Sequence, residues 1–133
     1  MTTHSGLPIT WTAANSKSVP FGTTEASDAI SPSAGTIAAT LQLRAKNDGA
    51  PQAGDTVTCK IRFTTGDTDG AGGDEFDTFE HAMLAVELDT SLEDPAERTI
   101  QIPWPWKGAI VSARNNSAGR NITVSGIVYE LKS

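Results

Sequence analysis

Apolar and polar side chains alternate with a period of two through much of this chain. In residues 55–63 (DTVTCKIRF), apolar residues fill every second position, with threonine, lysine and arginine between them. Residues 36–46 (TIAATLQLRAK) alternate in the same way and run into the turn residues Asn47-Asp48-Gly49. This period puts one face of a β-strand against a core, so both segments are predicted to be strands. The residues predicted to face the core are Val57, Cys59, Ile61 and Phe63 in the first segment and Ile37, Ala39, Leu41, Leu43 and Ala45 in the second.

A third alternating segment, residues 121–131 (NITVSGIVYEL), changes parity at Gly126. Its apolar residues are Ile122 and Val124 before the glycine, and Ile127, Tyr129 and Leu131 after it. A β-bulge or bend at Gly126 would return both sets to one face. The sequence therefore predicts a strand that is interrupted at this glycine.

Shorter strands are expected at residues 9–12, 99–102 and 109–113. Residues 76–88 (FDTFEHAMLAVEL) fit either a helix or a strand. We favour a strand from about Ala82, with a short helical turn before it as an option, because the neighbouring segments are all strands.

Seven or eight short strands separated by turns predict an all-β chain that folds as one antiparallel β-sandwich, with a jelly roll as the leading topology. The chain has 133 residues, which suits a single domain. Residues 1–35 are rich in Ser, Thr, Ala and Gly and show little alternation. We expect them to form either an extended arm that orders on a partner or an edge strand with long loops, and residues 36–133 to form the sandwich.

The net charge of −6 is unevenly distributed. Residues 63–97 hold eleven acidic residues and no lysine or arginine, whereas the rest of the chain holds all ten basic residues. Binding to the phosphate backbone of nucleic acids needs a positive surface, so nucleic acid is not an expected partner. The segregation of charge favours a polarised assembly subunit.

Several other classes are disfavoured by the sequence. No apolar run approaches the roughly 20 residues of a membrane span, and we expect neither a membrane partner nor a secretory signal. Nucleophilic catalysis needs a nucleophile, a base and an orienting group. The histidines are His4 and His81, and Cys59 lies at an inward strand position, so no enzyme activity is predicted.

The acidic loop at residues 66–77 (GDTDGAGGDEFD) is the strongest candidate for a ligand site. Its carboxylates could supply oxygen ligands to Ca²⁺, although the EF-hand spacing is not met. The alternative is a solvated loop between strands, with no cofactor. The candidate ligands are Asp67, Asp69, Asp74 and Glu75.

A second unusual segment, Ile102 to Lys107 (IPWPWK), holds two tryptophans between prolines that keep the chain extended. Tryptophan is enriched at binding hot spots and also plugs the ends of sandwich cores. Stacking on sugar rings is a third option. The candidate interface residues are Trp104, Pro105, Trp106 and Lys107, together with Ile9 and Trp11 of the N-terminal segment. For Trp11, a core position is the default.

From about residue 36 onward, the order of turn and strand motifs resembles small β-sandwich virion proteins of tailed bacteriophages, of the capsid decoration (cement) type. The motifs are Asn47-Asp48-Gly49, Gly54-Asp55-Thr56-Val57, Thr65-Gly66-Asp67, the acidic loop, Glu80-His81, Ile102-Pro103, Asn115-Asn116-Ser117 and the closing Ile-Thr-Val-Ser strand. The resemblance implies a virion location on the capsid surface, assembly in the host cytoplasm, and contacts with the major capsid protein and with further copies, for example as trimers. A tail or head-tail component and a carbohydrate-binding module are the alternatives.

Overall fold

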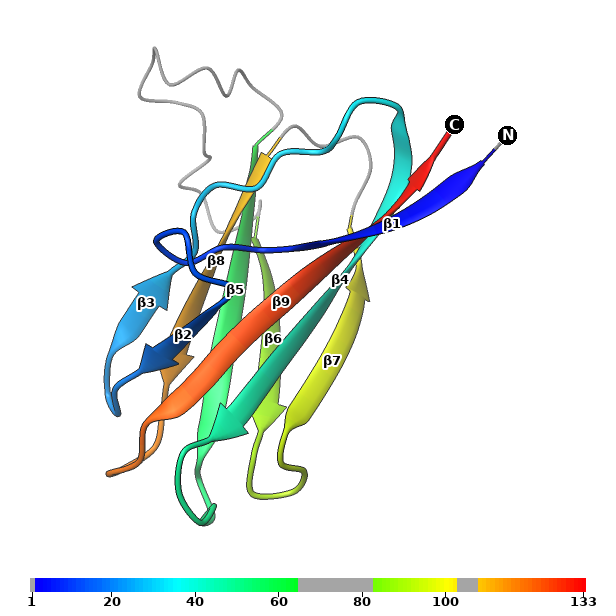
Figure 1. Cartoon of the computed structure of the whole chain (residues 1–133). Coiled ribbons are helices and arrows are strands. Elements are labelled where there is room, and N and C mark those ends of the chain that lie inside the picture. Colours follow the sequence, from blue (N-terminus) through cyan, green and yellow to red (C-terminus); the bar gives the residue numbers. More distant parts are fainter. Residues whose placement is uncertain (1, 65–82, 103–107) are drawn as a thin grey trace.

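A computed structural model describes residues 2–64, 83–102 and 108–133, and these ranges contain β-strands and loops without a helix (Figure 1). The strands are β1 (Thr3–Pro8), β2 (Ser16–Val19), β3 (Thr24–Ala26), β4 (Thr36–Asn47), β5 (Thr56–Thr64), β6 (Met83–Asp89), β7 (Ala96–Gln101), β8 (Gly108–Asn115) and β9 (Ile122–Lys132). All pairings between these strands are antiparallel. The predicted all-β class is confirmed.

Two sheets pack against each other in the order that defines a jelly roll. One sheet has the order β1-β9-β4-β7, with β2 also pairing with β9, and the other has the order β3-β8-β5-β6. From β2 to β9, the first strand pairs with the last, the second with the next to last, and so on inward to β5 and β6. A long antiparallel ribbon rolled up in this way is a jelly roll, so the predicted sandwich is confirmed.

The buried faces of β4 and β5 are the ones that the alternation predicts. Leu41 and Leu43 of β4 are each 1% exposed, and Val57 and Ile61 of β5 are fully buried. Their side chains meet between the sheets in one continuous core. Removing this apolar surface from water is the main favourable contribution to folding.

One residue of this set, Ile37, was predicted to face the core but is 46% exposed. The pairing of β4 with β9 shifts register between Thr36 and Ala38. This irregularity turns Thr36 inward, where it is 8% exposed, and turns Ile37 outward.

The bulge predicted at Gly126 is wrong. β9 pairs with β4 in unbroken register from Leu131 to Ile122, and buried positions continue at every second residue through the glycine. Gly126 itself belongs to the inward set, because Ile9 occupies the space above it. The backbone N–H of Ile9 donates to the carbonyl oxygen of Gly126 at 2.9 Å.

A Gly126→Ala substitution is expected to lower the free energy of unfolding by about 1 to 3 kcal/mol, the usual cost of overpacking. A Cβ at this position would lie 2.7 Å from Cδ1 of Ile9 and 3.2 Å from Cδ2 of Leu43. Adding Ile9→Val removes the Cδ1 atom and should recover part of the loss. The control is Gly119→Ala, where a Cβ meets nothing within 4 Å. Equal urea midpoints for the Gly126 and Gly119 variants would contradict this account.

The N-terminal segment contributes strands to both sheets. β1 and β2 follow one another along the same edge of β9, and β3 pairs with β8 (Figure 1). Residues 9–12, predicted to form a strand, instead lead into a tight turn in which Trp11 and Ala14 exchange backbone hydrogen bonds of 2.7 and 3.1 Å. The alternation that suggested a strand here reflects two anchors, Ile9 and Trp11, whose side chains enter the core.

This turn has positive φ at both central residues, Thr12 (52°) and Ala13 (66°), as in a type I′ turn. Residues with a Cβ disfavour that conformation. Asp28 stabilises it, since its carboxylate accepts the backbone N–H groups of Thr12 at 3.1 Å and Ala13 at 3.0 Å. These bonds, together with one from the Thr10 hydroxyl, hold the pKa of Asp28 below its ordinary value.

The remaining strand predictions agree with the structure. Residues 83–89 form β6, so the choice of a strand over a helix is confirmed for this part, and the preceding residues of the ambiguous segment lie outside the described ranges. The short strands expected at residues 99–102 and 109–113 fall on β7 and β8, which are longer than predicted.

Candidate functional site

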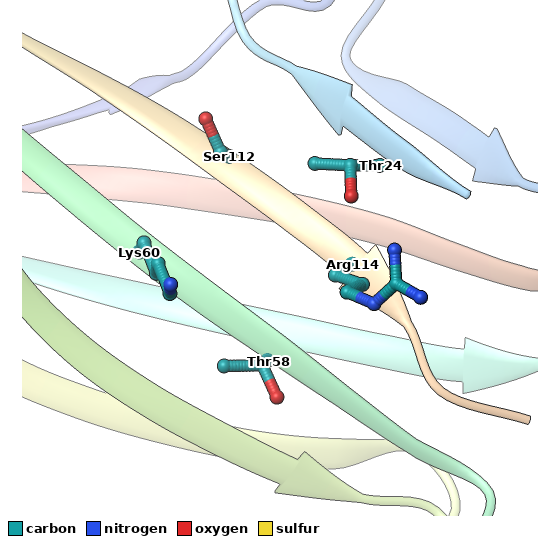
Figure 2. A pocket seen from close by; sticks show the side chains of 5 residues that line it. All are labelled: Thr24, Thr58, Lys60, Ser112 and Arg114. Carbon is teal, nitrogen blue, oxygen red and sulfur yellow. The ribbon is translucent and has the colours of Figure 1, made fainter. Parts of the chain in front are cut away.

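The outer face of the sheet β3-β8-β5-β6 carries a shallow hollow of about 310 Å³. Figure 2 shows that its side chains come from three adjacent strands. They are Thr24 of β3, Thr58 and Lys60 of β5, and Ser112 and Arg114 of β8.

Period two and strand register together create this hollow. Thr58 and Lys60 alternate with the buried residues Val57, Cys59 and Ile61, so they point away from the core. On the neighbouring strand, Ser112 lies opposite Lys60 and Arg114 lies opposite Thr58. Thr24 lies opposite Arg114 from the other side. The five residues are therefore neighbours on one outward face.

The chemistry of the hollow suits an anionic group. Lys60 and Arg114 are exposed, and neither forms an ion pair with any residue in the described ranges. The hydroxyls of Thr24, Thr58 and Ser112 add donors between them. Arginine binds carboxylates through paired N–H groups, and the methylene stems of both cations and the threonine methyls provide apolar walls.

The turn between β6 and β7 is chemically opposite to the hollow. Leu92 is 83% exposed, and acidic residues stand on both sides of it: Asp89, Glu93 and Asp94. The turn is held firmly at its base. Thr90 is 1% exposed and donates from Oγ1 to the carbonyl oxygen of Asp55 at 2.7 Å, while Ser91 donates to the Asp89 carboxylate through its backbone N–H at 2.9 Å.

A buried ion pair joins the loops at the same end of the sandwich. The Asp55 carboxylate is fully buried and accepts from Nε and Nη2 of Arg120, the second at 2.6 Å. It also accepts from Asn47 Nδ2 and from the backbone N–H of Gln52, each at 3.0 Å. These hydrogen bonds, with that of Arg120 the largest effect, lower the pKa of Asp55 to about 2. The residues are internal to the fold, so this cluster has a structural role.

Glu130 is a second buried carboxylate, 1% exposed at an inward position of β9. It accepts from the backbone N–H of Ser33 at 2.8 Å and from the hydroxyls of Ser33 and Thr36, each at 2.7 Å. Burial acts to raise the pKa of Glu130, but these hydrogen bonds outweigh it and leave the pKa below its ordinary value. Glu130 thereby fixes the loop that leads into β4.

The sequence-based candidates fall into two groups. Ile9 and Trp11 are 3% and 1% exposed, so both side chains lie in the core and offer no contact area on the surface of the folded chain. The other candidates lie outside the described residues, as does His81. They are the interface residues Trp104, Pro105, Trp106 and Lys107 and the acidic-loop residues Asp67, Asp69, Asp74 and Glu75.

Three further observations concern kinds of site or protein that were considered from the sequence. Within the described ranges, no group of three or more His, Cys, Asp or Glu side chains is placed to hold a metal ion. Cys59 is 1% exposed, and burial raises the pKa of its thiol to about 12. A buried, protonated thiol packs as a small apolar side chain. No helix among the described residues has the length and hydropathy to span a membrane.

Sequence reasoning did not find the hollow. It correctly identified the outward face of β5, but Arg114 lies 54 positions after Lys60 and becomes its neighbour only through the pairing of β5 with β8. The one indication in the sequence was that Lys60 and Arg114 are basic residues at outward positions of two separate strands. The partner strand could not be chosen without the topology.

Comparisons with known proteins leave the family open. No family model matches the chain, and no curated protein matches it. Among solved structures, the crystal structure of FLHE is 15% identical, with a TM-score of 0.44 over 97% of this chain and 96% of the other. A structure of Desmodium yellow mottle tymovirus is 11% identical, with a TM-score of 0.43 over 99% of this chain and 87% of the other.

Proposed function

We propose that this protein is a non-enzymatic structural component of a tailed bacteriophage particle, and specifically a decoration protein that binds the outer surface of the capsid. It binds the major capsid protein and further copies of itself. It is added to the head after assembly in the host cytoplasm and stays on the virion surface.

The observation that carries the proposal is the segregation of charge on a closed sandwich. The interior is filled by the side chains of the two sheets. Lys60, Arg62 and Arg114 lie on one outer sheet face, with Glu87 at its β6 side, and the turn after β6 is acidic. Such a molecule interacts through its surfaces. A basic patch and an acidic turn at different places on one surface favour ordered contacts between repeated copies.

Two further features support the phage context. The jelly roll is an architecture that capsid proteins use, although the fold alone does not determine function. The order of turn motifs from about residue 36 onward resembles that of phage decoration proteins. In this role the protein acts without covalent chemistry: it bridges neighbouring capsid subunits and opposes the outward pressure of the packaged DNA.

The test is cryo-microscopy of the virion that carries this protein. We expect density for the sandwich on the outside of the head, at repeated positions between capsid subunits. Density on the tail or at the head-tail junction would replace the proposal by the tail alternative. Its absence from the particle would overturn both.

Carbohydrate binding is the competing function from another class. A glycan array with the wild-type protein and Trp104→Ala distinguishes it from the structural role. If the protein has only a structural role, no glycan binding should be lost in the Trp104→Ala variant. Calcium binding is tested separately, by comparing melting temperatures with EDTA and with added Ca²⁺; equal values would remove the acidic loop as a metal site.

A further inference from the structure

We propose that the basic hollow of one molecule binds the acidic turn between β6 and β7 of a second copy. The hollow consists of Thr24, Thr58, Lys60, Ser112 and Arg114. The acidic turn consists of Asp89 to Asp94, with Leu92 at its tip. This inference rests on the proposed function, for which it supplies a contact between copies.

Charge complementarity is the first argument. Lys60 and Arg114 have no ion-pair partner within the described ranges, and Arg62 extends the basic surface along β5. Glu87 of β6 is the acidic neighbour on this face, where it is exposed opposite Thr58, so the basic surface lies on the β5 and β8 side of the hollow. The turn presents carboxylates, and Glu93 is bound only loosely, by Arg98 at 3.9 Å with both side chains about half exposed or more. Such an exposed pair contributes little stability and is readily exchanged for a closer one.

Leu92 is the second argument. Its exposed fraction of 83% is the largest among the large apolar side chains in the described part of the chain. The walls of the hollow consist of threonine methyl groups and the methylene stems of Lys60 and Arg114. A leucine side chain between flanking acids therefore matches both the apolar walls and the cationic ends of the hollow.

The third argument is preorganisation. Buried Thr90 anchors the turn by donating a hydrogen bond to the carbonyl oxygen of Asp55. The Asp89 carboxylate accepts hydrogen bonds from the backbone N–H and the hydroxyl of Ser91. The N–H groups of Leu92 and Glu93 both donate to the carbonyl oxygen of Asp89, at 3.3 and 3.2 Å. A turn that is already ordered loses little entropy when it binds. Because the contact joins two different patches, it either closes reciprocally between two copies or continues from copy to copy.

The test is sedimentation velocity of the purified protein over a range of concentrations. At low ionic strength, about 0.01 M, we expect reversible self-association that weakens strongly toward about 1 M salt. Lys60→Glu and Glu93→Lys should each weaken association by about tenfold or more, since each places like charges together. Leu92→Ser should weaken it without changing the salt dependence. Lys46→Glu, which makes the same charge change on β4 of the other sheet, is the matched control and should associate as wild type.

Mixing the two charge variants gives the decisive result. Each retains one intact patch, so an equimolar mixture of Lys60→Glu and Glu93→Lys should associate more strongly than either variant does alone. A wild-type protein that stays monomeric at low salt, or a mixture that does not associate, would overturn the proposal. Wild-type monomers that bind heparin through Lys60 and Arg114 would overturn it in favour of a different anionic occupant. Since every arm uses the isolated protein, failure here leaves capsid binding to be decided by microscopy.

Discussion

Replacing Asp55 by alanine will lower the free energy of unfolding by about 3 kcal/mol, as expected when one partner of a buried ion pair is removed. The carboxylate is fully buried and binds Arg120, Asn47 and the backbone of Gln52. Its loss leaves the Arg120 guanidinium, whose side chain is only 22% exposed, without its counter-charge. Chemical denaturation followed by tryptophan fluorescence measures the change.

The matched control is an exposed ion pair on the same fold. Glu97 lies 3.7 Å from Arg44, and the two side chains are 43% and 50% exposed. Glu97→Ala should therefore change the free energy of unfolding by no more than about 1 kcal/mol. Equal losses for the Asp55 and Glu97 variants would show that burial does not decide the strength of these pairs.

Asp55 also makes the free energy of unfolding depend on pH, with a definite sign. Its pKa is lowered from 3.8 to about 2 in the folded chain, so its stabilisation is complete above the unfolded value and is lost as the pH falls toward 2. A shift of this size corresponds to about 2 to 3 kcal/mol. Between about pH 5 and pH 2, the stability of the wild type should fall more steeply than that of Asp55→Asn. Parallel curves would contradict the assignment. Glu130 contributes in the same direction, and its contribution remains in both proteins.

The parts of the fold that sequence predicted correctly depend on local alternation. β4 and β5 bury long runs of apolar side chains on one face, and that pattern is complete within each segment. Leu41, Leu43, Val57 and Ile61 could therefore be assigned to the core before any pairing was known.

The errors arise where residues far away in the sequence determine which side chains of a strand face inward. The change of parity at Gly126 predicts a break, because hydropathy assigns Ile127, Tyr129 and Leu131 to the inward set. The inward residues after Gly126 are instead Val128 and Glu130, and Ile9 packs on Gly126 itself. Glu130 is inward because Ser33 and Thr36, separated from it by 97 and 94 positions, satisfy its carboxylate. Hydropathy alone assigns a glutamate to the surface.

The individual strands β2 and β3 and the hollow could not be predicted from the sequence, for a related reason. β2 and β3 have four and three residues and are held by pairing with β9 and β8 rather than by their own alternation. Likewise, the basic hollow exists only where β3, β8 and β5 lie side by side. Patterns within single segments cannot predict which strands become neighbours, and surfaces composed of several strands therefore emerge only with the topology.

A Trp11→Ala substitution is expected to lower the free energy of unfolding by about 3 to 5 kcal/mol, the cost of removing a buried tryptophan from a core. Trp11 is 1% exposed and packs in the cluster formed by both sheets. Its position depends on the strained turn at Thr12 and Ala13, which Asp28 holds in place. The measurement is the urea midpoint of the isolated protein, since a residue that serves only as an interface would leave that midpoint unchanged.

Trp11→Phe separates the contribution of packing from that of the indole N–H. Within the described part of the chain, Nε1 of Trp11 is buried without a hydrogen-bond partner, so its removal breaks no hydrogen bond there. Phenylalanine should therefore retain most of the stability that alanine loses, with a deficit set by the smaller ring. A phenylalanine variant as unstable as the alanine variant would mean that the N–H, and not the packed ring, is what the core requires. An alanine variant that unfolds at the wild-type midpoint would place the indole outside the core and restore Trp11 as a contact residue for a partner.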